Sequence, residues 1–183
     1  MRFLVGMILV LLLASCRQEV RVKPAAMLRL DYPAPVYKEA VSDCPYEFVK
    51  NSEATLEPKE NCWMNLHYGR MKATVYLTYR PIANNNLDSL LYDAQKLTYD
   101  HTIKADAIFE QPRVDSVNRV YGMFYMIDGN AATQSQFYVT DSVNHFVTGS
   151  LYFESKPNFD SIYPAVVYLR EDIRRIMETI SWK

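Results

Sequence analysis

The residues able to carry out chemistry are few. The chain has three histidines, His67, His101 and His145, and none stands at a spacing typical of a metal site such as HExxH. His101 lies on the apolar side of a predicted helix, where a buried or capping histidine is commoner than a general base. GxSxG, Walker and GxGxxG motifs are absent from the sequence, and five glycines offer little for a phosphate-binding loop. We therefore predict no catalytic, metal-binding or cofactor-binding residues.

The most specific signal is a cysteine near the amino terminus. Arg2 precedes an apolar run that is too short to span a bilayer, which is typical of a secretory signal. The run ends in Leu13-Ala14-Ser15-Cys16, which resembles a bacterial lipobox, so we expect residues 1–15 to be cleaved and Cys16 to be lipidated. An ordinary signal peptide followed by an incidental cysteine is the alternative. Several acyl chains on Cys16 would hold the protein on a membrane, since each buried CH₂ contributes about 0.8 kcal/mol.

The other two cysteines, Cys44 and Cys62, lie in the exported part of the chain. Thiols that reach an oxidising compartment tend to pair, so the sequence favours a disulfide between them. Two buried free thiols, or one reactive thiol, are the competing interpretations. A Cα separation above about 7 Å would exclude the bridge.

The predicted secondary structure that surrounds these residues is clearest in the second half of the chain. Residues 120–127, 134–140 and 145–153 are three β-prone segments joined by short polar turns, which predicts consecutive hairpins. A helix then begins near Ile162, because apolar residues recur at steps of three and four as far as Ile180. This apolar stripe has to be buried, and the preceding sheet is the nearest apolar surface.

The first half is less regular. Residues 28–32, 46–49, 63–68, 72–79 and 107–110 are candidate strands, the last of them stopped by Pro112. A helix follows the cap Asn84-Asn85-Asn86 and ends near Lys104. We predict an α+β fold in which a single antiparallel sheet carries helices on both faces, an α/β/α sandwich with a long C-terminal helix. The strand order within residues 28–80 stays open. Residues 16–27 are interpreted as a lipidated linker and residues 28–183 as one globular domain.

Composition narrows the possible partners. The net charge of −1 favours neither nucleic acid nor an anionic membrane surface. The 14 tyrosines fit either ordinary β-sheet composition or a ligand-binding aromatic surface. The polar loop containing Asp128, Asn130 and Gln134 could face a partner, although turn chemistry alone explains it.

Several short motifs in fixed order carry a family resemblance. They are the lipobox, Cys44-Pro45-Tyr46-Glu47-Phe48, Trp63-Met64-Asn65-Leu66, the segment His101–Ile108, the segment Gly129–Phe137 and the tail Arg170–Trp182. Together they resemble the gliding-motility lipoprotein family GldD of Bacteroidota. The arrangement of strands before a long C-terminal helix is more loosely similar to the PsbP-type sandwich, which is an analogy of fold alone.

The resemblance implies a membrane-anchored lipoprotein needed for gliding and for type IX protein secretion. It would work beside other motility lipoproteins and membrane proteins, without enzymatic activity. Only Cys16, as lipid acceptor, carries a role over from the family. Arg17-Gln18-Glu19 after the cysteine lacks the acidic run of surface-directed lipoproteins, which favours an anchor that faces the periplasm from either membrane.

Two functions of different class remain. A non-enzymatic assembly or scaffold component predicts an exposed apolar patch without a deep polar cleft. A periplasmic small-ligand or glycan-binding lipoprotein predicts a pocket or groove with convergent polar groups, lined in part by tyrosines.

Overall fold

The computed structural model describes residues 32–100, 104–154 and 158–183. Cys16, His101 and all but the last residue of the strand predicted at residues 28–32 lie outside these ranges, so these predictions are untested. The described elements, in chain order, are β1 (Tyr37–Glu39), β2 (Tyr46–Glu47), β3 (Val49–Asn51), β4 (Thr55–Pro58), η1 (Glu60–Cys62), β5 (Met64–Tyr68), η2 (Gly69–Met71), β6 (Ala73–Pro81), α2 (Leu87–Tyr99), β7 (Ala105–Asp115), β8 (Val120–Gly129), β9 (Thr133–Thr140), β10 (His145–Phe153), α3 (Phe159–Thr179) and β11 (Ser181–Trp182).

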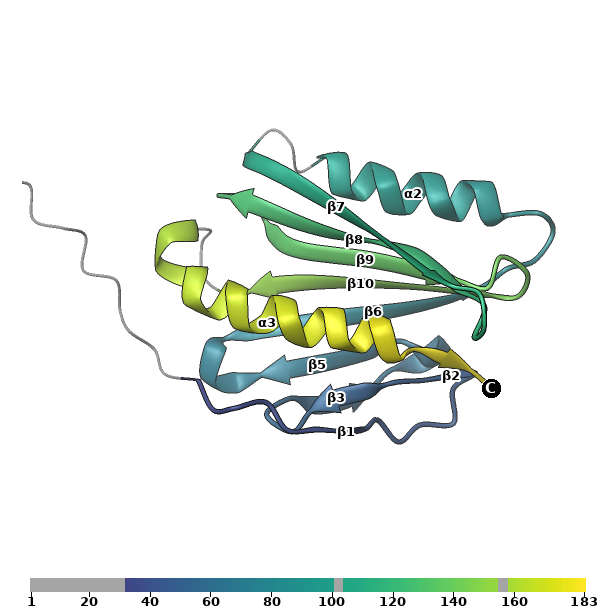
Figure 1. Ribbon diagram of the computed structural model, residues 1–183, viewed down its shortest axis with the longest axis horizontal. Helices are drawn as coiled ribbons and strands as arrows, with labels where there is room; N and C mark the ends of the chain where they lie inside the picture. Colours follow the sequence, from purple (N-terminus) through teal and green to yellow (C-terminus); the bar gives the residue numbers. More distant parts are fainter. Residues whose placement is uncertain (1–31, 101–103, 155–157) are drawn as a thin grey trace, which may run out of the picture.

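A seven-stranded sheet forms the body of the protein, in the order β4-β5-β6-β10-β9-β8-β7. Every neighbouring pair in it is antiparallel. The three strands β8, β9 and β10 follow one another as the hairpins predicted from the sequence. The sheet is completed across β6 and β10, which are far apart in the sequence yet lie side by side (Figure 1).

One face of this sheet packs against α3. The apolar stripe of the helix is buried as its period predicts, and Val166, Leu169, Ile173 and Ile176 are fully enclosed. Alternation along the strands turns Val75, Leu77, Phe137, Val139, Val147 and Leu151 toward the same core. Gly149 lies opposite Phe137, and a Cβ there would meet the Phe137 ring at 2.1 Å. The glycine therefore makes room for the aromatic ring.

The other face carries α2. The Thr98 hydroxyl donates to Gln136 Oε1 at 2.7 Å, and the two side chains are buried between helix and sheet. At the edge strand β7, the Tyr99 hydroxyl donates to the Glu110 carboxylate. α2 ends at Tyr99, earlier than predicted.

Two small sheets lie beside the large one. β1 pairs with β3, and β2 pairs with the C-terminal β11, each antiparallel. The predicted α+β class, mainly antiparallel sheet and long C-terminal helix are confirmed, but the single sheet of the prediction is three sheets in the structure. Residues 46–49 form parts of two strands because Tyr46 pairs with the C-terminal tail while Val49 pairs with β1.

A buried carboxylate fastens the β1–β3 segment to α3. Asp172 is 1% exposed and accepts hydrogen bonds from the Tyr37 hydroxyl at 2.7 Å and from Asn51 Nδ2 at 2.8 Å. Asn51 Nδ2 also donates to the Tyr168 hydroxyl at 2.9 Å. Burial raises the pKa of Asp172 above its ordinary value, although the hydrogen bonds oppose this shift.

Candidate docking surface

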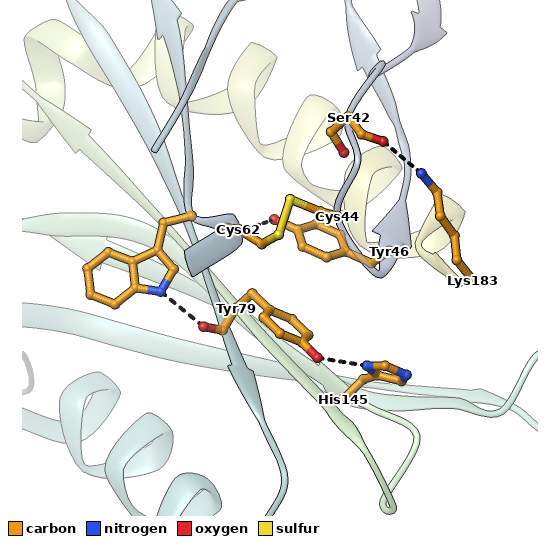
Figure 2. Close-up of a disulfide and its surroundings, with 8 residues drawn as sticks. Ser42, Cys44, Tyr46, Cys62, Tyr79, His145 and Lys183 are labelled. Atoms are coloured by element: carbon orange, nitrogen blue, oxygen red, sulfur yellow. Dashed lines mark hydrogen bonds between the residues drawn. A yellow bond between two sulfur atoms is a disulfide. The ribbon is translucent and has the colours of Figure 1, made fainter. Parts of the chain in front are cut away.

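The disulfide borders one end of the sheet. Cys44 and Cys62 are joined, with their Cα atoms 5.5 Å apart, within the range that a disulfide spans. The bridge ties the loop before β2 to η1 at the start of β5, and the Tyr46 hydroxyl donates to the Cys62 carbonyl beside it (Figure 2). The pairing favoured from the sequence is thus the one that the structure contains.

A row of aromatic rings runs from this bridge to the C-terminus. Tyr46 stacks on Tyr79 with centroids 5.7 Å apart, and the Tyr79 hydroxyl hydrogen-bonds to His145 Nδ1 at 2.9 Å (Figure 2). His145 in turn stacks on Trp182, with centroids 5.1 Å apart. Trp182 Nε1 donates to the Arg119 carbonyl at 3.0 Å. The C-terminal tail is therefore fixed between the β9–β10 and β7–β8 turns.

The β9–β10 turn is rigid. Asp141 Oδ1 accepts the backbone N–H groups of Val143, Asn144 and His145 at 2.8–2.9 Å. Burial opposes ionisation of Asp141, but these three N–H groups outweigh it and hold its pKa below the ordinary value. Val143 projects from the turn with 51% of its surface exposed.

The β7–β8 turn has a similar construction. Asp115 accepts the backbone and side-chain N–H groups of Asn118, at 3.1 and 3.0 Å, and pairs with Arg113 at 2.9 Å. The hydrogen bonds from Asn118 lower the pKa of Asp115. Val117 sits at the tip and is 91% exposed. Each turn thus holds a valine in solvent at a fixed position.

We define the distal surface as Val41, Val117, Val143, His145 and Trp182. It occupies the end of the sheet where β11 terminates, whereas the described chain begins near the opposite end, where α3 starts (Figure 1). Two hollows flank it. One of about 320 Å³ is lined by Val41, Ser42 and Lys183 among others, and one of about 520 Å³ by Ile82, Asn85 and Val143 among others. A surface with exposed apolar tips and hollows beside them can receive apolar side chains of a partner.

The polar loop singled out in the sequence lies at the other end of the sheet. Asp128 Oδ1 pairs with Arg170 at 2.6 Å, Asn130 Oδ1 accepts the N–H of Phe159 at the start of α3, and Gln134 is 1% exposed with its Nε2 bound to a neighbouring carbonyl. These contacts anchor α3 to the β8–β9 turn. Of the three side chains, only Asp128 and Asn130 keep surface that a partner could reach.

No sequence motif marks the distal surface. Its valines and Trp182 come from segments far apart in the sequence, and only their common exposure at one end unites them. His67 and His145 lie in strands, as expected. Within the described ranges no three His, Cys, Asp or Glu side chains gather as metal ligands would. Nor does any helix there have the length and apolar character needed to cross a bilayer.

Comparison with known proteins adds one match. A comparison with curated proteins gave no significant match, and neither did one with solved structures, so the similarity to the PsbP-type sandwich stays a prediction. A family model described as gliding motility lipoprotein GldD matches residues 17–182 of the 183-residue chain. This match spans every described element and reaches the last residue of β11, so the chain belongs to the gliding motility lipoprotein GldD family.

Proposed function

We propose that the protein is a non-enzymatic assembly component of the gliding machinery and of the associated type IX secretion machinery. Acylated Cys16 holds it on a membrane, facing the periplasm, and its distal surface docks on another membrane protein or lipoprotein of that machinery. Family membership itself implies involvement in gliding motility and a membrane-anchored location. The scaffold role, secretion, the anchor residue and the partner are the proposal.

The observation that carries the docking role is the placement of exposed apolar side chains on rigid turns. Three exposed valines stand on loops around Trp182, and Asp115 and Asp141 fix two of those loops by hydrogen bonds to backbone N–H groups. A fixed loop loses little conformational entropy when a partner binds, so more of the contact energy appears as affinity.

The distal surface lies away from the end at which the described chain begins, which supports contact with a partner at a distance from the bilayer. The described chain starts near the end of the sheet opposite the distal surface (Figure 1). The segment that leads from the tether, β1 to β3, is bound to the body through Asp172 and through the Cys44–Cys62 bridge. The start of the described chain, which leads from the proposed tether, is therefore joined firmly to the body that carries the distal surface.

Gene deletion with complementation tests the function. We expect the deletion strain to lose both colony spreading and secretion of a reporter substrate, and the wild-type gene to restore both. Cys16→Ala should leave the protein in the soluble fraction and fail to complement. Retained spreading and secretion in the deletion strain would contradict the proposal.

Substitutions at the distal surface test how it works. A Val117→Asp/Val143→Asp double variant should accumulate at the wild-type level in membranes but fail to complement. Val36→Asp provides the matched control, because Val36 is an exposed valine outside the distal surface. Affinity capture from solubilised membranes should recover a machinery component with the wild type and the control but not with the double variant. Full complementation by the double variant would remove the distal surface from the proposal.

A further inference from the structure

Among residues 32–100, 104–154 and 158–183, none covers one part of the sheet face that carries α2. α2 lies over Thr78, Phe146, Thr148 and Tyr138, toward the β10–β9–β8 side. Register places Asn65 beside Tyr76, His67 beside Thr74, and Tyr152 on the other side of Thr74, all on the same face beyond the helix. We define the open face as Glu57, Trp63, Asn65, His67, Tyr76 and Tyr152. It is a separate surface from the distal surface.

Aromatic side chains form a diagonal across this face. Trp63 precedes β5 in extended conformation, so alternation puts its side chain on the side of Asn65 and His67. Trp63 and Tyr76 are each 43% exposed, which is unusual for large rings on strands of an otherwise buried sheet. Tyr76 packs edge-on to Tyr152, with centroids 5.8 Å apart. The rings thus project from the residue before β5 and from the strands β6 and β10.

The polar groups between the rings are held in place. Glu57 accepts hydrogen bonds from Lys59 Nζ at 2.7 Å and from Asn65 Nδ2 at 3.2 Å, and it contacts His67 Nε2 at 2.9 Å. The other ring nitrogen of His67 lies 3.1 Å from the Thr74 hydroxyl. The bonds from Lys59 and His67 lower the pKa of Glu57 to about 2, so the carboxylate is ionised at neutral pH.

The charges of this network cancel within it. The Glu57 carboxylate is balanced by the Lys59 ammonium, so the face offers donors and acceptors without a strong field of either sign. A neutral, hydroxyl-rich ligand fits this chemistry better than an anion or a cation does. The core of a protein interface, by contrast, is depleted in charged residues. Here polar and charged side chains alternate with the rings, and the exposed valines of the protein lie elsewhere.

From these features we infer that the open face binds an unbranched, neutral β-linked glycan. The apolar C–H faces of successive sugar rings stack on Trp63 and Tyr76, because aromatic rings bury a large apolar area while leaving their edges accessible. The hydroxyl groups at the sugar edges bond to Asn65, Glu57 and His67, which the network has already oriented. The rings are spread diagonally over neighbouring strands, which suits an extended chain better than a compact ligand. The inference also gives a role to part of the tyrosine content noted in the sequence.

This inference does not depend on the docking proposal. A protein that fails to complement gliding could still bind the glycan, and one that docks through its distal surface need not do so. Binding to the open face is measured in vitro, whereas the distal surface is tested by complementation.

Calorimetric titration of the full acylated chain tests the inference. The protein is kept in lauryldimethylamine oxide, because detergents with sugar head groups would compete. The probes are cellohexaose and chitohexaose, two unbranched, neutral β-linked chains. We expect saturable binding to at least one of these probes. Trp63→Ala and Tyr76→Ala should each weaken it by about tenfold, the loss expected for one stacked ring.

The control substitution is Tyr92→Ala. Tyr92 is a 65% exposed tyrosine on the outer side of α2, so its removal should leave affinity unchanged. In a Trp182→Phe background Trp63 is the remaining tryptophan, and its emission should shift when a sugar covers it. Binding to neither probe overturns the inference, as does affinity that is unchanged in both ring variants. A dimer that Tyr76→Glu dissociates, detected by sedimentation velocity, would assign the face to a second copy of the chain and overturn it too.

Discussion

Replacement of Asp172 tests the joint between the β1–β3 segment and the body. Asp172→Ala removes the acceptor of two hydrogen bonds, from Tyr37 and Asn51. Hydrogen bonds to a charged group contribute about 1.5–3 kcal/mol each. The carboxylate is almost fully buried, and the cost of its desolvation offsets part of this gain. We expect the free energy of unfolding to fall by about 2 kcal/mol, which lowers the Tm by about 4–8 °C in a chain of this size.

The isosteric Asp172→Asn variant separates charge from packing. Asn keeps an oxygen that can accept from Asn51 but has no ionisable group, so the free energy of unfolding should fall by about 1 kcal/mol. The folded state raises the pKa of Asp172 above its unfolded value near 3.8. The native contribution of Asp172 is therefore complete below that value and declines as the pH rises through the folded pKa. The stability advantage of wild type over Asp172→Asn should shrink as the pH increases from about 4 toward neutrality.

Urea unfolding followed by tryptophan fluorescence across this pH range measures the difference directly. Other carboxylates with lowered pKa, such as Asp115 and Asp141, destabilise the protein as the pH falls, but they do so equally in both variants. Tyr37→Phe should reproduce part of the loss of stability seen in Asp172→Ala, because it removes one of the two groups that donate to the carboxylate. A difference between wild type and Asp172→Asn that grows with pH would refute the burial argument.

Three further predictions concern stability. Reduction of the Cys44–Cys62 bridge, or the Cys44→Ser/Cys62→Ser double substitution, should lower the free energy of unfolding by about 3 kcal/mol. Reductant should therefore lower the Tm of the wild type and leave the already lower Tm of the double variant unchanged. Gly149→Ala should lower the free energy of unfolding by about 1–3 kcal/mol, because the added methyl overlaps the Phe137 ring. If urea unfolding finds the variant as stable as the wild type, the ring moves freely and the prediction is wrong. Arg170→Met should lower the free energy of unfolding by about 2 kcal/mol or more. The substitution removes the guanidinium that donates to the carbonyls of Ile127 and Gln134 and to the carboxylate of Asp128. Hydrogen exchange in the β8–β9 turn should rise in that variant, and unchanged protection would contradict the assigned anchor.

Local sequence patterns were sufficient to predict the second half of the fold. Local periodicity is sufficient where an element buries one face against its own neighbours. The apolar stripe from Ile162 to Ile180 therefore predicted α3, and the β-prone segments and turns within residues 120–153 predicted β8, β9 and β10. The order of motifs likewise predicted the family, and the cysteine count favoured the bridge between Cys44 and Cys62.

Tertiary pairing decided what local patterns could not. β7 continues past Pro112, although the sequence predicted a stop there, because an edge strand has one side without ladder partners and can accommodate a missing N–H. The pairing of β6 with β10 and of β2 with β11 joins residues that no local period connects. Exposure is also a property of the assembled sheet. Tyr76 resembles the other strand tyrosines in sequence, and Val117 and Val143 resemble ordinary turn residues. Only the packed structure places Tyr76 beyond the reach of α2 and the two valines at one end of the sheet, because the position of one element relative to another depends on contacts between distant segments.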